Sequence, residues 1–148
     1  MGIKIERVIP ASREKVWSEL ADLASHATWM KDAVEVEFLG TARSGVGTRM
    51  RVPTKVGLFR TVDILEVTEW VEGQSMGVDH KGLVSGTGRF SLEGDDPTTV
   101  VWEETLRFPW WLGGPVVAFL ARPILRWIWK GNLQRFSAGF GSRSPNHG

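Results

Sequence analysis

Residues 3–30, which read IKIERVIPASREKVWSELADLASHATWM, decide the fold of this chain. An alternating segment places Ile3, Ile5 and Ile9 on one side and predicts a strand that stops at Pro10. Two short helical segments follow, at about 13–22 and 26–30. This order of a strand, two short helices and a return to extended chain predicts a sheet built around an apolar cavity.

From Ala33 onward, apolar and polar residues mostly alternate between turn signals, which predicts six consecutive strands. The predicted strands lie at about 34–38, 48–52, 58–70, 76–80, 88–92 and 99–106. Short turns between them favour an antiparallel meander. The strand at 58–70 has no clear inner face, and we expect a bulge between Val62–Ile64 and Leu65–Val67.

A long helical segment is predicted at about 112–140, with Pro115 in its first turn and a kink or break at Pro123. Its apolar stripe consists of Leu125, Trp129, Leu133, Phe136 and Phe140. This helix is the only predicted element long enough to cover the apolar face of the meander. We therefore expect an α+β fold, in which a curved antiparallel sheet of about seven strands surrounds the long C-terminal helix.

The length of 148 residues fits one domain, predicted over residues 1–141, with a disordered tail at 142–148. The formal net charge of +1 gives no support for a nucleic-acid partner. The 42% hydrophobic content, with eight tryptophans, indicates a globular core that has much ring surface to bury.

Cysteine is absent, which excludes disulfides and thiolate zinc sites. The histidines are His26, His80 and His147, too far apart in sequence to suggest a metal site. The paired glycines lack the spacing and context of nucleotide-binding loops, so we expect no metal and no cofactor. No signal peptide and no apolar span of about 20 residues is visible, so we expect a soluble, cytoplasmic protein.

Several short motifs occur in an order that is typical of one fold family. They lie at 9–12 (IPAS), 16–17 (VW), 20–22 (LAD), Trp29, 34–36 (VEV), 45–51 (GVGTRMR), 67–70 (VTEW) and 99–104 (TVVWEE). With these motifs the chain resembles the START-like SRPBCC superfamily, in its polyketide cyclase/dehydrase and lipid-transport branch. The resemblance implies a helix-grip fold with an internal cavity that binds a hydrophobic small molecule such as a lipid or a polyketide. It implies no catalytic motif, and the absence of tyrosine removes any phenol from the pocket.

Two residues are candidates for proton transfer. Glu104 lies between Trp102 and Leu106 on the apolar side of the last strand, where a carboxylate could act as a general acid or base. His80 follows two inward residues of its own strand. Both also have structural interpretations: Glu104 as a rim carboxylate or an arginine partner, with Arg7 as the cation, and His80 as a hydrogen-bonded strand end.

The candidate ligand-binding residues combine inward strand positions with aromatic residues of the helices. They are His26, Trp29, Met50, His80, Phe90, Trp102, Glu104, Phe119 and Trp127. Aromatic residues at helical spacing are also typical of plain core, so a structural role remains open for Trp29, Phe119 and Trp127.

Three functional hypotheses remain open from the sequence. The first is binding of a hydrophobic small molecule in an internal cavity without assigned catalysis. The second is a cyclase or dehydratase in which Glu104 and His80 transfer protons. The third is a weak contact with a membrane surface through Trp110, Trp111 and the basic C-terminal helix. The sequence does not indicate the ligand, the pathway or the oligomeric state.

Overall fold

The computed structural model describes residues 2–141, the side chains of Val56 and Phe59 excepted. Its elements are β1 (Gly2–Ile9), α1 (Arg13–Ala21), η1 (Leu23–Ser25), α2 (His26–Trp29), β2 (Glu37–Phe38), β3 (Arg49–Val56), β4 (Phe59–Val71), β5 (Ser75–Lys81), β6 (Ser85–Gly94), β7 (Thr98–Arg107), η2 (Trp110–Leu112) and α3 (Gly114–Gly141). The predicted order of a strand, two short helices, six strands and a long helix is confirmed. The predicted tail at 142–148 lies outside the described residues.

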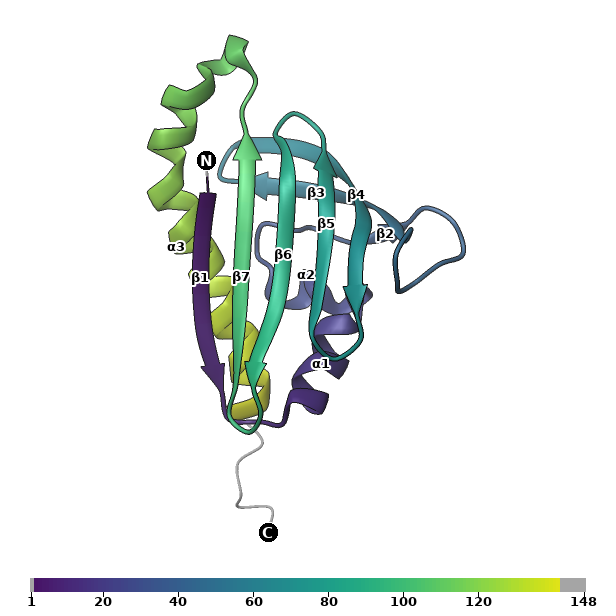
Figure 1. The fold of residues 1–148 in the computed structure, drawn as a ribbon. Helices are drawn as coiled ribbons and strands as arrows, with labels where there is room; N and C mark the ends of the chain where they lie inside the picture. Colours follow the sequence, from purple (N-terminus) through teal and green to yellow (C-terminus); the bar gives the residue numbers. More distant parts are fainter. Residues whose placement is uncertain (1, 142–148) are drawn as a thin grey trace.

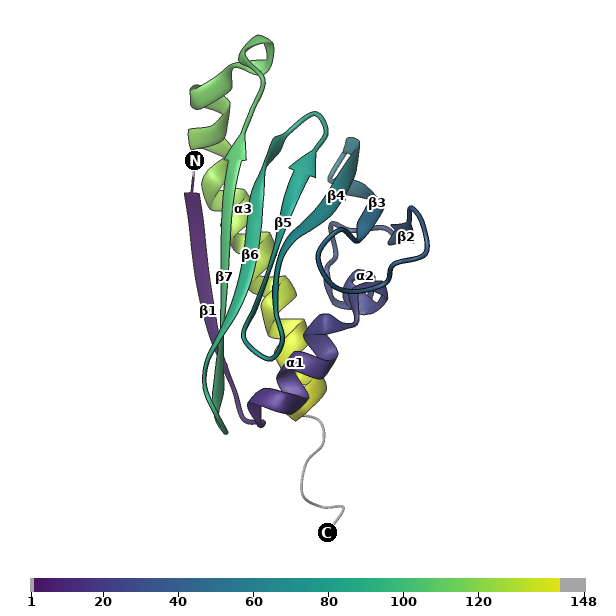
Figure 2. The same ribbon diagram turned by 45° about the vertical axis from the view of Figure 1, so that its right-hand side comes forward.

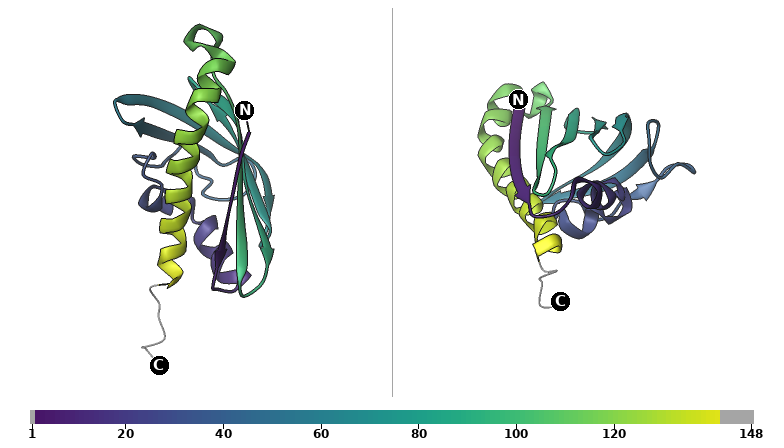
Figure 3. Two further views of the ribbon diagram at one scale, coloured as in Figure 1. Left: turned by 90° about the vertical axis from the view of Figure 1, so that its left-hand side faces the viewer. Right: turned by 60° about the horizontal axis from the view of Figure 1, so that its bottom comes forward.

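The seven strands form one antiparallel sheet in the order β1-β7-β6-β5-β4-β3-β2. Strands β2 to β7 are a meander, and the first strand of the chain pairs with the last, Ile5 opposite Trp102. Figure 1 shows α3 running along the sheet beside β1 and β7, and Figure 3 shows the sheet curving around the helix. The predicted curved sheet around a terminal helix is therefore confirmed.

The two short helices lie at one end of this arrangement, next to the C-terminal part of α3 (Figure 2). Helix α1 begins at a cap in which the Ser12 side chain accepts a hydrogen bond from the amide of Lys15 at 3.3 Å. Its apolar side buries Val16, Trp17 and Leu20. Burying that side against the sheet closes this end of the fold.

Helix α3 is continuous over its 28 residues, although Pro123 lies inside it. Of the two predicted effects of Pro123, a kink or a break, the break is therefore wrong. Pro123 is exposed, so its ring meets solvent at a position where no packing against the sheet is lost. Pro115 stands in the first turn, as predicted. The predicted stripe is confirmed: Trp129, Leu133, Phe136 and Phe140 are buried, and Leu125 is half-buried.

Aromatic rings fill the space between α2, the sheet and the second half of α3. We call this set the aromatic cluster: Trp29, Phe90, Trp102, Trp129 and Phe136. Trp102 stacks on Trp129 with ring centroids 5.5 Å apart, and Trp29 meets Phe136 at 5.0 Å. Each packed ring of this size buries a large apolar area, which stabilises that end of the molecule.

Strand β4 differs from the prediction. It has an inner face, made by Thr61, Asp63, Leu65 and Val67, and its register shifts between Val67 and Glu69 rather than earlier. The inner positions near the start of β4 are polar, whereas Val62 is 41% exposed on the other side. The sequence pattern therefore did not reveal the inner face, because at the start of β4 the inward side chains are polar and the outward one is apolar.

Among residues 2–141, no helix is long and apolar enough to cross a membrane.

Candidate ligand-binding cavity

A cavity of about 440 Å³ lies between the concave face of the sheet and the first half of α3. The strands β3 to β7 all contribute to its wall, together with η2, α3 and the segment after α2. Most of the lining is apolar, including Met30, Met50, Met76, Val78 and Leu106. The aromatic cluster forms one boundary through Phe90, Trp102 and Trp129, so the cavity begins where the packed rings end.

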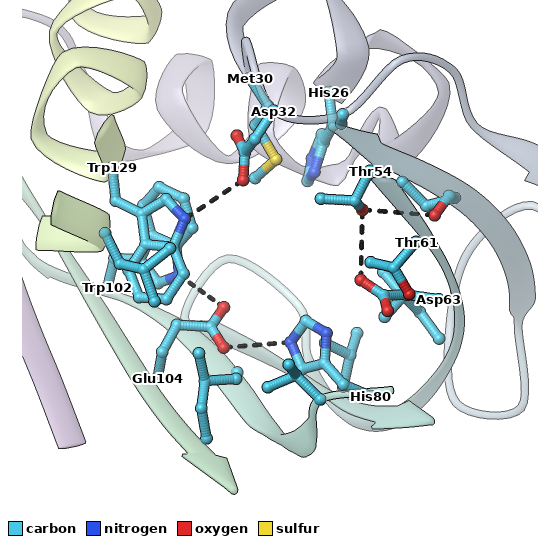
Figure 4. Close-up of a pocket in the computed structure, with 18 of the residues that line it drawn as sticks. His26, Met30, Asp32, Thr54, Thr61, Asp63, His80, Trp102, Glu104 and Trp129 are labelled. Atoms are coloured by element: carbon cyan, nitrogen blue, oxygen red, sulfur yellow. Dashed lines mark hydrogen bonds and ion pairs between the residues drawn. The ribbon is translucent and has the colours of Figure 1, made fainter. Parts of the chain in front are cut away.

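Glu104 of β7 and His80 of β5 meet inside this cavity although β6 separates their strands (Figure 4). Their Oε2 and Nε2 atoms are 3.1 Å apart. The contact depends on Gly88 of β6, which pairs with Glu104 in the sheet. A Cβ at Gly88 would lie 2.6 Å from Glu104 Oε1, so only glycine leaves room for the carboxylate to cross the strand.

Glu104 is 7% exposed, and its second carboxylate oxygen accepts a hydrogen bond from Trp102 Nε1 at 2.9 Å. The predicted inward position of Glu104 is therefore confirmed. The expected partner, Arg7, is wrong. Its side chain is exposed at the edge strand β1, and Arg7 pairs with Val100, whereas Glu104 pairs with Ile3 at the other end of the strand. Histidine takes the place predicted for arginine.

The pKa of His80 is raised. Burial is the largest single influence and lowers it, but the charge of Glu104 and the contact with that carboxylate, together with the charges of Asp63 and Asp79, outweigh burial. The protonated imidazolium is thus favoured beside Glu104. A carboxylate and an imidazolium in contact within a cavity form a pair that can give and take a proton.

A second polar group lies across the cavity on β3 and β4. Thr54 donates a hydrogen bond to Asp63 Oδ2 at 3.2 Å, and Thr61 lines the wall beside them. Burial raises the pKa of Asp63, and the charges of Asp32 and Glu104 raise it further, against His80 and the Thr54 hydroxyl, which lower it. The Oδ1 atom of Asp63 is buried and has no hydrogen-bond partner within the described residues.

Asp32, in the segment after α2, joins the cavity wall to α3. Its Oδ1 accepts from Asn132 Nδ2 at 2.7 Å, and its Oδ2 accepts from Trp129 Nε1 at 3.3 Å. The Asn132 side-chain oxygen in turn accepts from the amide of Lys31 at 3.0 Å. These bonds hold the segment after α2 against the long helix.

His26 lines the cavity from α2. Its Nε2 lies 2.7 Å from the carbonyl oxygen of Leu20, which can only accept, so Nε2 carries the proton. Burial lowers the pKa of His26, and the bond to Leu20 and the charge of Asp22 offset this only in part. The neutral ring is favoured, in contrast to His80.

Six of the predicted ligand-binding residues line the cavity: His26, Met50, His80, Phe90, Trp102 and Glu104. Three of the predicted residues do not. Trp29 is buried in the aromatic cluster, away from the cavity wall. Phe119 and Trp127 are 75% and 76% exposed, because they lie on the side of α3 that faces away from the sheet. Their predicted position in the cavity is wrong.

Sequence reasoning missed four polar residues of the wall: Asp32, Thr54, Thr61 and Asp63. The spacing of two residues places Thr61, Asp63 and Leu65 on one face of β4. Because two of the three are polar, the sequence does not show that this face points inward. Asp32 follows a short helix and carries no periodic signal. Among the described residues, no group of three or more histidine, aspartate or glutamate side chains could hold a metal ion.

A curved antiparallel sheet that holds a long C-terminal helix over a cavity is the helix-grip fold of START-like proteins. The family model described as "Polyketide cyclase / dehydrase and lipid transport" matches residues 2–143. The chain belongs to this family. No curated protein matches the sequence.

Solved structures with the same fold come from several bacteria. A protein from Thermus thermophilus has 23% identity and a TM-score of 0.71, over 97% of this chain and 96% of that one. A START superfamily protein from Mycobacterium smegmatis has 18% identity and a TM-score of 0.72, over 97% and 99%. The ZhuI aromatase/cyclase from Streptomyces sp. R1128 has 15% identity and a TM-score of 0.70, over 97% and 94%. Likeness at these identities concerns the fold.

Proposed function

We propose that this protein binds a hydrophobic small molecule, such as a lipid or a polyketide-like ring system, in the cavity. The cavity of about 440 Å³ is the observation that carries the proposal. Protein interiors are normally close-packed, and ligand pockets typically measure about 300–1,000 Å³. An apolar wall with a few polar side chains is the usual lining of such a pocket. The family description, which includes lipid transport, supports the same class of ligand.

A variant that fills the cavity tests this proposal. Ala121 lines the cavity from α3, whereas Ala138 is exposed on the same helix. We expect Ala121→Phe to weaken binding of lipids and aromatic polyketides by about tenfold or more, which corresponds to about 1.4 kcal/mol. Ala138→Phe is the matched control and should bind as the natural protein does. Binding is measured by displacement of the uncharged dye Nile red and by native mass spectrometry for a co-purified molecule.

Equal affinity in Ala121→Phe and Ala138→Phe would place the ligand elsewhere on the protein. No saturable binding of any compound, Nile red included, would contradict the proposal itself.

A second candidate function is catalysis of proton transfer on a bound ring precursor, as in a cyclase or dehydratase. The observation in its favour is the contact of Glu104 with His80 inside the cavity. It predicts that Glu104→Gln keeps ligand affinity but loses turnover of a polyketide precursor. Glu103→Gln is the control, because Glu103 is the exposed neighbour on the other face of β7. Unchanged turnover in Glu104→Gln would remove this candidate.

The third candidate is a weak contact with an anionic membrane surface. Large apolar side chains are exposed along η2 and the first half of α3: Trp110, Trp111, Val116, Phe119, Leu120, Ile124 and Trp127. Arg107, Arg122, Arg126 and Lys130 lie near them, and the sequence has no acid after Glu104. Ile124 also lines the cavity, so this apolar face continues into the cavity wall.

Interfacial tryptophans with neighbouring cations are typical of binding to anionic lipid. We expect co-sedimentation with vesicles of anionic lipid at low salt, weaker binding at high salt and none with vesicles of zwitterionic lipid. Absence of binding to anionic vesicles at low salt would contradict this contact.

A further inference from the structure

The ionisable groups of the cavity wall are unevenly distributed in sign. Three carboxylates line it, from Asp32, Asp63 and Glu104, together with His26 and His80. Within the part of the chain that the structure describes, no lysine or arginine lines the cavity. Figure 4 shows the three carboxylates on different sides of the open space, so a ligand in the middle meets acceptors in several directions.

The positive charge of a protonated His80 is already paired with the Glu104 carboxylate. Its Nε2 lies 3.1 Å from Glu104 Oε2, and the pair together carries no net charge when His80 is protonated. His26 donates its Nε2 proton to the Leu20 carbonyl and favours the neutral form. Neither histidine is left as an independent counter-ion for an anionic ligand.

The three carboxylates differ in how many of their oxygens have a partner within the protein. Both oxygens of Asp32 accept hydrogen bonds, and Glu104 Oε1 accepts one from Trp102. Glu104 Oε2 makes no hydrogen bond among the described residues, but it lies 3.1 Å from His80 Nε2 in an ion pair. Asp63 accepts only from Thr54 among the described residues, and its Oδ1 is buried without a partner. A buried acceptor with no donor is costly, and a donor on a bound ligand would offset that cost.

These observations restrict the polar end of a ligand. A carboxylate or phosphate would be buried among like charges and would find no cationic side chain to neutralise it. A hydroxyl donates to a carboxylate and also accepts from a protonated one, and an ammonium group supplies both donors and the opposite charge. A cavity lined by hydrogen-bond acceptors therefore favours ligands whose polar end donates hydrogen bonds over ligands whose polar end is an anion.

We infer that the cavity selects apolar molecules whose polar end donates hydrogen bonds, a hydroxyl or an ammonium group, over those that end in a carboxylate or phosphate. The inference rests on the proposed function, since it concerns the ligand of the same cavity. Asp63 is the principal acceptor, with Glu104 facing it from across the cavity.

The experiment compares dodecanol, dodecylamine and dodecanoate, which share one hydrocarbon chain and differ only at the polar end. Each displaces Nile red from the intact protein at neutral pH, below its micelle concentration. We expect the alcohol and the amine to bind at least about tenfold tighter than the carboxylate. Asp63→Asn should reduce the advantage of the amine several-fold, whereas Glu103→Gln, which removes an exposed carboxylate from the outer face, should leave it unchanged.

The possible outcomes distinguish failure of the selectivity from failure of the proposed binding function. If the carboxylate binds as tightly as the alcohol and the amine, the selectivity is refuted while hydrophobic binding stands. A donor preference that survives in both Asp63→Asn and Glu104→Gln would refute its assignment to these carboxylates. If Nile red and all three compounds fail to bind, the proposed function fails and the inference falls with it.

Discussion

The two halves of α3 face the same sheet but have opposite surroundings. In the second half, Trp129, Leu133 and Phe136 are buried against the aromatic cluster, and the space is filled. In the first half, Phe119 and Leu120 are exposed, and Val117 and Ala121 border the cavity. One helix therefore provides stability at one end and an accessible hollow at the other.

The difference comes from side-chain size and chemistry on the facing strands. Near the second half of α3 the sheet offers Phe90 and Trp102, whose rings pack on each other, and Trp102 also stacks on Trp129 of the helix. Farther along the same strands stand Gly88 and Glu104, and the glycine leaves open the volume into which the carboxylate extends. A protein of this kind separates the part that holds it together from the part that accommodates a ligand.

The largest expected effect is at the packed end. We expect Trp102→Ala to lower the free energy of unfolding by about 3–5 kcal/mol, because it removes a buried ring that stacks on Trp129. Trp127→Ala, on the exposed side of α3, should change it by less than about 0.5 kcal/mol. Urea denaturation followed by circular dichroism measures both. Similar losses in the two variants would show that the ring stacked on Trp129 stabilises the fold no more than an exposed ring, which would contradict the assignment of this end as the packed one.

The second largest effect on stability is expected at Gly88, which lies between the packed end of the fold and the cavity. Gly88→Ala should cost about 1–3 kcal/mol, because the new methyl group displaces the Glu104 carboxylate. The displaced carboxylate should also let the pKa of His80 fall, which a histidine NMR titration reports. Gly139→Ala is the control, since a Cβ at that position of α3 meets nothing within 4 Å. An unshifted His80 titration in Gly88→Ala would show that the carboxylate does not need this gap.

A smaller, pH-dependent effect is expected from Glu104→Gln. Folding raises the pKa of His80, so the pair adds stability that is fully present below the ordinary pKa of histidine. That contribution is lost as pH rises through the raised pKa of the folded protein. In Glu104→Gln the pKa of His80 should be lower, and the stability lost relative to the natural protein should shrink across this window. Urea midpoints over a pH series test the sign; a loss that grows with pH would contradict it.

The smallest effect on stability is expected at η2. Trp110 is 86% exposed, so the double change Trp110→Ser with Trp111→Ser should alter the free energy of unfolding by less than about 0.5 kcal/mol. The same variant should lose most of its binding to anionic vesicles, because both rings face solvent beside basic residues. Unchanged vesicle binding would assign any membrane contact to another surface.

The sequence predicted the architecture well because each element carries its own local signal. Ile3, Ile5 and Ile9 alternate, and Trp129, Leu133 and Phe136 repeat at helical spacing. The same rules failed where inward positions are polar or outward positions apolar. Asp63 was missed and Phe119 was misplaced, because periodicity detects amphipathic faces and cannot tell a core from a cavity or from an exposed surface.

The amino-acid sequence by itself determined the order of the strands and helices, the inward position of Glu104 and the resemblance to a family of cavity proteins. Only the tertiary structure decided that Glu104 reaches His80 across a glycine, that Asp32 and Asp63 face the same hollow, and that half of α3 is exposed. The physical reason is that local pattern fixes which face of an element is apolar. Which distant side chains share a space depends on strand register, on the curvature of the sheet and on the volume left between packed groups.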